Sequence, residues 1–135
     1  MAEIRIIKAN QLETEVASGS MTRLAGVSAN LVGAQGIHLA IATIPPEGSS
    51  SAHCHTNCES AIYITRGRGR FLVGENLETA LEFEAGDFIY VPQDALHLPI
   101  NDGPETVEMV VARNSPVEIV QEYTATAQQG AGADR

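Results

Sequence analysis

The sequence predicts an all-β fold in which one small barrel spans residues 1–123. Short apolar runs alternate with turn residues at intervals that are typical of antiparallel barrels. Tryptophan is absent and aromatic residues make up only 4% of the chain, so the core must be built from isoleucine, leucine, valine and alanine. Such β-branched content favours strands. A chain of 135 residues buries roughly two-thirds of its unfolded surface, which is enough for one core.

The first half of the chain predicts three strands. Residues 4–7 are apolar and open the fold, and residues 21–27 stand out from a stretch rich in serine, alanine and glycine. Residues 37–44 form the clearest strand, which ends at Pro45 and Pro46 because proline has no N–H to donate to a sheet. No segment shows a convincing helical period.

The second half predicts six more strands, each bounded by turn residues. They cover residues 60–65, 71–73, 77–83, 88–91, 95–100 and 107–112. Gly67, Arg68 and Gly69 predict a hairpin between the first two of these strands. Residues 124–135 contain mainly alanine, glutamine and glycine, which have little to bury, so we expect a disordered tail.

Four side chains fall at spacings that suit metal ligands: His53, His55, Glu59 and His97. Side chains two residues apart share one face of a strand, so His53 and His55 can point together into a cavity. A His-x-His pair by itself is more often a polar strand surface. The surrounding residues decide between the two interpretations.

Those residues form two blocks, which comprise Gly48, His53, His55, Glu59 and Gly67 in the first and Gly86, Pro92, His97 and Asn101 in the second. Together the blocks resemble the two signature motifs of the cupin superfamily. Asp94 stands where the family usually has glycine, a mild departure because aspartate tolerates left-handed turns. In the first block the Gly48-to-His53 spacer is one residue shorter than in the family pattern. The Glu59-to-Gly67 spacer is one residue longer.

The resemblance implies a single-domain jelly-roll barrel, also called a double-stranded β-helix. It also implies one divalent transition metal bound by His53, His55, Glu59 and His97. Three imidazoles and a carboxylate suit manganese, iron or nickel, with zinc, cobalt and copper as alternatives, and they leave open positions on a six-coordinate ion.

Three functions follow from such a site, and the fold does not choose among them. We favour a metal-dependent dioxygenase acting on a small organic substrate that chelates the ion through oxygen. The alternatives are a non-redox isomerase, decarboxylase or lyase, and a binding or sensing module without turnover. Glu59 is the candidate catalytic residue, as a proton acceptor. Tyr63, Phe71, Phe88 and Met109 are the candidate substrate contacts.

Three further residues are open to more than one interpretation. We expect His38 to be a surface histidine, although it could serve as an acid or base at the cavity rim. Cys54 and Cys58 lie beside the ligands, and we expect free thiols packed away from the cavity; a local disulfide or a redox role is the alternative.

A net charge of −9 argues against nucleic acid as a partner, because phosphate backbones are bound by clustered lysine and arginine. The one basic cluster, Arg66, Arg68 and Arg70, is interpreted as a solvated turn. With no signal-like or membrane-spanning stretch, we expect a cytoplasmic protein without a membrane partner. We also expect a homodimer that pairs through outward-facing apolar residues such as Ile62, Ile64 or Leu98.

Overall fold

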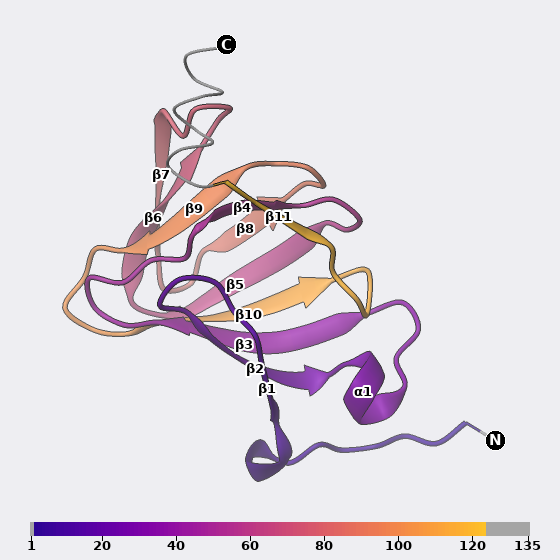
Figure 1. Ribbon diagram of the computed structural model, residues 1–135. Coiled ribbons are helices and arrows are strands. Elements are labelled where there is room, and N and C mark those ends of the chain that lie inside the picture. Colours follow the sequence, from indigo (N-terminus) through magenta and orange to yellow (C-terminus); the bar gives the residue numbers. More distant parts are fainter. Residues whose placement is uncertain (1, 124–135) are drawn as a thin grey trace.

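The computed structural model describes residues 2–123, which fold into two antiparallel sheets that face each other (Figure 1). One sheet has the order β1-β2-β3-β10-β5-β8 and the other the order β11-β4-β9-β6-β7. The strands are β1 (Glu13–Glu15), β2 (Thr22–Val27), β3 (His38–Ile44), β4 (Ala52–His55), β5 (Ser60–Arg66), β6 (Arg68–Val73), β7 (Thr79–Glu84), β8 (Phe88–Val91), β9 (His97–Asn101), β10 (Val107–Arg113) and β11 (Val120–Tyr123). The predicted all-β jelly-roll architecture is confirmed.

Most of the predicted strands are present, but the ends of the chain differ. The strand expected at residues 4–7 is absent: Ile4 is 98% exposed and Ile6 is 74% exposed, so their apolar side chains pack on no sheet within the described residues. Two short strands, β1 and β11, lie where no strand was expected. The helical content is small, comprising the 3-10 turn η1 (Ala9–Gln11) and the single turn α1 (Ala29–Val32).

The hairpin predicted at Gly67 is wrong. Strand β5 pairs with β10 and β8, whereas β6 pairs with β9 and β7, so the turn carries the chain from one sheet to the other. Gly67 has φ +86°, and a Cβ there would lie 2.9 Å from the Thr106 carbonyl oxygen. Glycine is therefore required by the crossing between the sheets. Asp94 adopts φ +68°, which confirms the left-handed turn expected for it.

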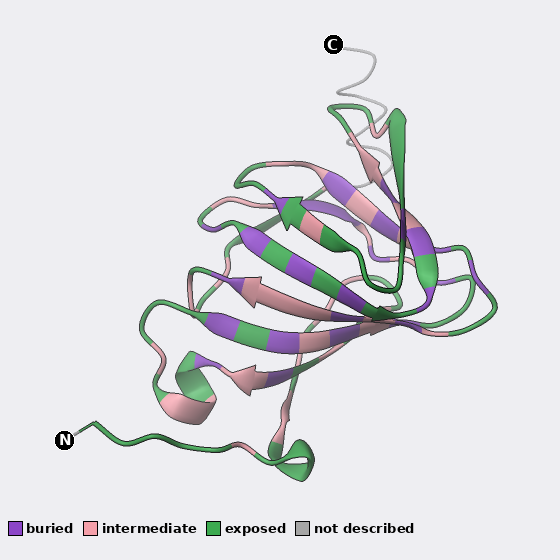
Figure 2. Cartoon of the chain, turned by 180° about the vertical axis from the view of Figure 1, so that it is seen from behind, coloured by how far each residue is buried: buried purple, intermediate pink, exposed green. Residues whose placement is uncertain are grey.

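The interior is arranged in rows across β3, β10 and β5. At one end, Arg113 of β10 lies opposite His38 of β3 and Ser60 of β5, and all three are buried. At the other end, Val107 lies opposite Ile44, and both are fully buried. Figure 2 shows the alternation of buried and exposed residues along the strands that places these side chains inside. One end of the interior is polar and the other apolar.

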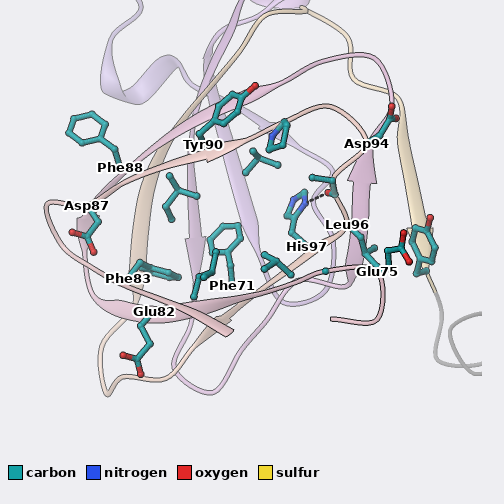
Figure 3. A pocket seen from close by; sticks show the side chains of 18 residues that line it. Phe71, Glu75, Glu82, Phe83, Asp87, Phe88, Tyr90, Asp94, Leu96 and His97 are labelled. Atoms are coloured by element: carbon teal, nitrogen blue, oxygen red, sulfur yellow. Dashed lines mark hydrogen bonds between the residues drawn. The ribbon is translucent and has the colours of Figure 1, made fainter. Parts of the chain in front are cut away.

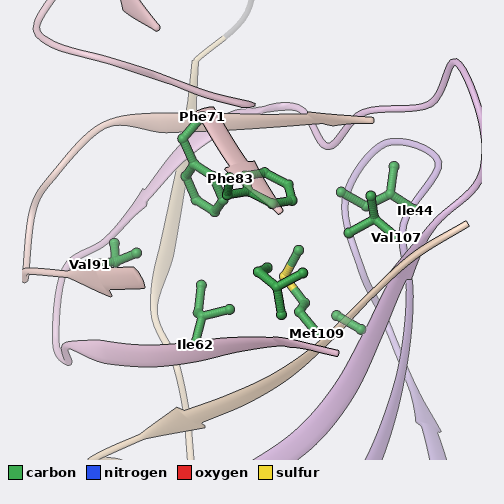
Figure 4. Packing of buried hydrophobic residues seen from close by; sticks show 9 residues of the cluster. Ile44, Ile62, Phe71, Phe83, Val91, Val107 and Met109 are labelled. Carbon is green, nitrogen blue, oxygen red and sulfur yellow. The ribbon is translucent and has the colours of Figure 1, made fainter. Parts of the chain in front are cut away.

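The apolar end is the hydrophobic core (Figure 4), which consists of Ala42, Ile44, Ile62, Ile64, Phe71, Phe83, Val91, Val107 and Met109. Ile62 is 7% exposed and Ile64 is 0% exposed, so both face inward. The expectation that they form a dimer interface is therefore wrong, because side chains two residues apart share one face of the strand, and this face packs in the core. The homodimer itself stays a prediction.

No helix within residues 2–123 is long and apolar enough to cross a membrane. The cytoplasmic location stays a prediction. The tail expected at residues 124–135 lies outside the described residues, and the extent of the barrel domain, residues 1–123, stays a prediction as well.

Candidate metal centre

Three of the four predicted ligands lie together inside the barrel. His53 and His55 lie on β4 and His97 on β9, and one ring nitrogen from each lies within 4.8 Å of the others. The two strands pair with His53 directly opposite His97, which brings these two ring centroids to 4.4 Å. His53 is 8% exposed and His97 is 5% exposed. Strand alternation therefore places the imidazoles as the sequence predicts.

Backbone carbonyls orient two of these rings. The Nδ1 atom of His53 lies 2.7 Å from the Ser51 carbonyl oxygen, and Nδ1 of His97 lies 2.8 Å from the Ala95 carbonyl oxygen, a contact drawn in Figure 3. A carbonyl oxygen only accepts hydrogen bonds, so each Nδ1 must carry the proton. The lone pair of each Nε2 is then free for a metal ion.

Burial keeps these imidazoles neutral. Desolvation, together with the nearby His53, lowers the pKa of His97 to about 4. Desolvation also lowers the pKa of His53, although the hydrogen bond to the Ser51 carbonyl opposes the shift. Because metal binding requires neutral imidazole, both rings are in the ligating form at neutral pH.

His55 faces a carboxylate that the sequence did not indicate. Its Nδ1 lies 2.8 Å from Oε2 of Glu118, a residue that precedes β11 and is 12% exposed. Burial alone would raise the pKa of Glu118. His55 and the guanidinium groups of Arg23 and Arg113 outweigh that effect and lower the pKa to about 2. Glu118 is therefore ionised inside the barrel.

The structure does not bring Glu59 to the histidines. Glu59 is exposed, and its Oε1 accepts a hydrogen bond of 2.9 Å from the Tyr90 hydroxyl. Along β5 the residues Ser60, Ile62 and Ile64 are buried, so Glu59, one position before Ser60, has the opposite parity. Its assignment as a ligand and proton acceptor stays a prediction.

Spacing explains this placement. Six residues separate the motif's glutamate from its glycine in the family pattern, and counting back from Gly67 by that spacing reaches Ser60. Ser60 is 4% exposed and lines the same cavity as the histidines. The one-residue shift that looked harmless in the sequence moves the carboxylate to the other face of the strand.

The histidines line a cavity of about 640 Å³ within the barrel. Phe71 and Met109, two of the predicted substrate contacts, also line it. His38 lines it as well and is only 2% exposed, so the expectation of a surface position is wrong. Its Nε2 lies 3.0 Å from both carboxylate oxygens of Glu15. A second imidazole–carboxylate pair therefore lies in the same cavity.

A cleft of about 1000 Å³ opens on the side of the barrel (Figure 3). It shares Phe71, Val91 and His97 with the metal cavity and is lined by the exposed ring of Phe88. Tyr63 is not among the residues that line either space. It packs against Phe88 on the outside, with ring centroids 4.7 Å apart.

The cysteines and the basic cluster have no part in the cavity. Cys54 and Cys58 are free and buried, as predicted, and burial raises the pKa of both thiols. Arg66 and Arg70 form exposed ion pairs with Glu105 and Asp102. The arginines that do line the cavity, Arg23 and Arg113, gave no sequence signal beyond their alternation with apolar neighbours on β2 and β10.

The donor set fits a divalent transition ion. His53 and His97 each present a free Nε2, and His55, whose Nδ1 lies 2.8 Å from Oε2 of Glu118, completes the cluster of ring nitrogens. The three histidines can therefore hold a metal ion.

Comparison with known proteins agrees with this architecture. A family model described as Cupin domain matches residues 40–113, which include all three histidines. Among curated proteins, no sequence matches this chain.

Solved structures share the fold at low identity. The polyketide cyclase RemF from Streptomyces resistomycificus superposes with a TM-score of 0.76 at 16% identity, covering 96% of this chain and 94% of that one. A cupin 2 conserved barrel domain protein from Rhodopseudomonas palustris gives 0.69 at 19% identity, covering 91% and 82%. Oxalate decarboxylase from Lactobacillus farciminis gives 0.70 at 24% identity, and the match covers 84% of this chain but 34% of the decarboxylase.

Proposed function

Given that the chain belongs to the Cupin domain family, we propose that it is a metal-dependent enzyme of dioxygenase type acting on a small, oxygen-chelating organic substrate. The observation that carries the proposal is the cluster of three imidazoles gathered at one cavity wall, with their ring nitrogens within 4.8 Å of one another. When bound, a manganese, iron or nickel ion would supply Lewis acidity and the ability to exchange electrons with dioxygen. His53, His55 and His97 would hold it.

Three protein ligands favour substrate chelation. A six-coordinate ion held by three histidines keeps three further positions, enough for two substrate oxygens and a small second reactant. The cavity of about 640 Å³ falls within the range that encloses small organic ligands.

The charges around the histidines support an anionic substrate. Arg23 and Arg113 lie in ion pairs with Glu118, and Arg23 also pairs with Glu15, so these four charges cancel. Histidine ligands add no charge, and Glu122, which also lines the cavity, would offset only part of the charge of a divalent ion. A deprotonated enediol, diketone or phenol would neutralise it.

Apolar side chains would hold the body of the substrate. Phe71 and Met109 line the cavity beside the histidines and are 4% and 1% exposed, respectively, so each offers a fixed surface that excludes water. Phe88 lies at the side cleft, where it would contact only a substrate that extends that far. Tyr63 stays a prediction, since it lies on the outer face.

The test is turnover with and without oxygen. The metal-loaded chain is incubated with a panel of catechols, β-diketones and enediols in an oxygen electrode, and products are identified by mass spectrometry. We expect oxygen uptake in proportion to product and none with His97→Ala. Equal turnover under anaerobic conditions would reject the dioxygenase, and stabilisation by a ligand without any product would favour a binding module.

A second candidate is a non-redox isomerase, decarboxylase or lyase, which the pair of buried His38 and half-buried Glu15 favours. Such chemistry needs a proton carrier in the cavity, and His38 lies there at 3.0 Å from a carboxylate. Reaction in D₂O should then place deuterium in the product, and His38→Gln should suppress it. Retention of every original hydrogen would argue against this candidate.

A further inference from the structure

We infer that Glu118 is the carboxylate of this metal site and that it acts as a positioning residue for His55. The inference rests on the proposed metal binding by the three histidines. Glu118, in the segment before β11, would supply the acidic group that Glu59 does not bring to the cavity.

The three histidines share one arrangement. Nδ1 of His53 faces a carbonyl oxygen at 2.7 Å, Nδ1 of His97 faces another at 2.8 Å, and Nδ1 of His55 faces the carboxylate of Glu118 at 2.8 Å. An oxygen at Nδ1 fixes the ring of a ligand histidine and leaves Nε2 for the ion. Glu118 therefore does for His55 what the backbone does for the other two.

Two arginines fix the Glu118 carboxylate. Nη2 of Arg23 lies 2.7 Å from Oε1, and Nη1 of Arg113 lies 3.2 Å from Oε2, the oxygen that faces His55. The guanidinium of Arg113 is itself anchored, because its Nε donates to the Ser115 carbonyl at 3.0 Å. The carboxylate thus cannot rotate away from His55 without breaking an ion pair.

Asn57 fixes the backbone on both sides of Glu118. Its Nδ2 donates to the Val117 carbonyl at 2.7 Å, and its Oδ1 accepts from the Ile119 N–H at 2.8 Å. Asn57 lies in the loop between the strand that carries His55 and β5. Asn57, which belongs to the first motif but is not a predicted ligand, therefore holds Glu118 in place.

Substitution of Glu118 tests the inference. Co²⁺ is titrated into the metal-free full chain, and its dissociation constant and visible absorption band are measured for the parent, Glu118→Gln, Glu118→Asp and Glu105→Gln. In Glu118→Gln the arginines would bind the single acceptor oxygen and turn the amide N–H toward His55. We expect a dissociation constant raised roughly 10- to 100-fold and a shifted band.

The other variants separate position from charge. Glu118→Asp keeps the charge and should lie nearer to the parent. Glu105→Gln makes the same change in charge at an exposed ion pair with Arg66, away from the cavity, and should leave both readouts unchanged. The double variant Glu118→Gln/Arg23→Gln removes one charge of each sign and should still bind weakly.

The outcomes are distinct. If the parent takes up no Co²⁺, the proposed function fails, and the inference fails with it. If the parent binds Co²⁺ and Glu118→Gln binds it equally well with the same absorption band, only the inference is overturned. Recovery of parental affinity in the double variant would also overturn it, because the loss would then come from an unpaired guanidinium rather than from the orientation of His55.

Discussion

The two ends of the barrel interior are built on the same strands, yet one is a packed apolar core and the other is a polar cavity. On β3 the inward positions run from His38 to Ile44, and on β10 they run from Arg113 to Val107. At the apolar end, side chains fill the space (Figure 4). At the polar end, small or polar residues leave a cavity, in which Arg23 and Arg113 pair with Glu118.

This difference shows how one sheet supports both stability and a site. Strand alternation makes all these positions point inward, and only the side-chain type decides whether the space is filled. Stability should therefore depend on the apolar end and ion binding on the polar end. Each prediction below tests that separation.

The largest effect should come from His97→Ala. Loss of a ligand should weaken ion binding by more than the roughly 100-fold that loss of a supporting contact causes. The control is His38→Gln, which changes a buried imidazole of the same cavity outside the triad. Co²⁺ titration of both variants checks this. Equal weakening in the two would mean that the cavity as a whole, and not the triad, binds the ion.

A change at the apolar end should affect stability alone. Ile64 is fully buried among core residues, so Ile64→Ala should lower the free energy of unfolding by about 2–5 kcal/mol. Urea denaturation measures the loss. Below the unfolding transition the variant should bind Co²⁺ as the parent does, and loss of binding in a folded variant would break the separation.

Acid should destabilise the metal-free protein because of two groups at the polar end, His97 and Glu118. The pKa of His97 is about 4 in the fold and 6.5 ordinarily, so between these values the unfolded chain takes up a proton that the folded chain does not. Stability therefore falls as pH drops from 6.5 to 4, by roughly 2–3 kcal/mol at about 1.4 kcal/mol per pKa unit. Glu118, with a pKa of about 2 against 4.5, extends the loss below pH 4.5.

Urea denaturation at a series of pH values checks this profile. In His97→Gln the fall between pH 6.5 and 4 should become shallower, while the loss below pH 4.5 remains. An unchanged profile in that variant would mean that His97 does not titrate as its burial implies. The same burial lowers the pKa of His53 and His97, so protonation of these two rings should compete with the ion only below the ordinary histidine pKa.

The smallest effect should come from Glu59→Gln. The hydrogen bond and charge of Glu59 raise the pKa of Tyr90, so this substitution should return the pKa of Tyr90 toward its ordinary value of 10. Ultraviolet titration of the tyrosines measures the shift. Co²⁺ affinity should stay at the parental level, whereas a weaker site would show that Glu59 reaches the ion as the sequence predicts.

Local signals predicted much of the fold. The strand expected at residues 88–91 coincides with β8, and β3, β5 and β10 differ from expectation by one residue at an end. Strands β1 and β11 were missed because they are short and carry no alternating apolar pattern. Their pairing comes from neighbouring strands, which is a tertiary effect.

The site was predicted where strand parity is unambiguous. His53 and His55 share a face whatever the register, so their convergence follows from spacing alone. Glu59 follows a bend, and a bend can shift parity by one residue. Glu118 lies in an irregular segment between β10 and β11, and its position depends on Asn57 and two arginines from elsewhere in the chain. No local pattern carries that information.

The most direct test of the account is the metal content of the chain, purified without a metal-affinity step and measured by elemental analysis beside His53→Ala, His55→Ala and His97→Ala. We expect one transition ion per parent chain and a large loss of bound metal in each of the three variants. A parent without a transition ion that also takes up none on dialysis against manganese, iron or nickel would contradict it, as would equal ion content in all four proteins.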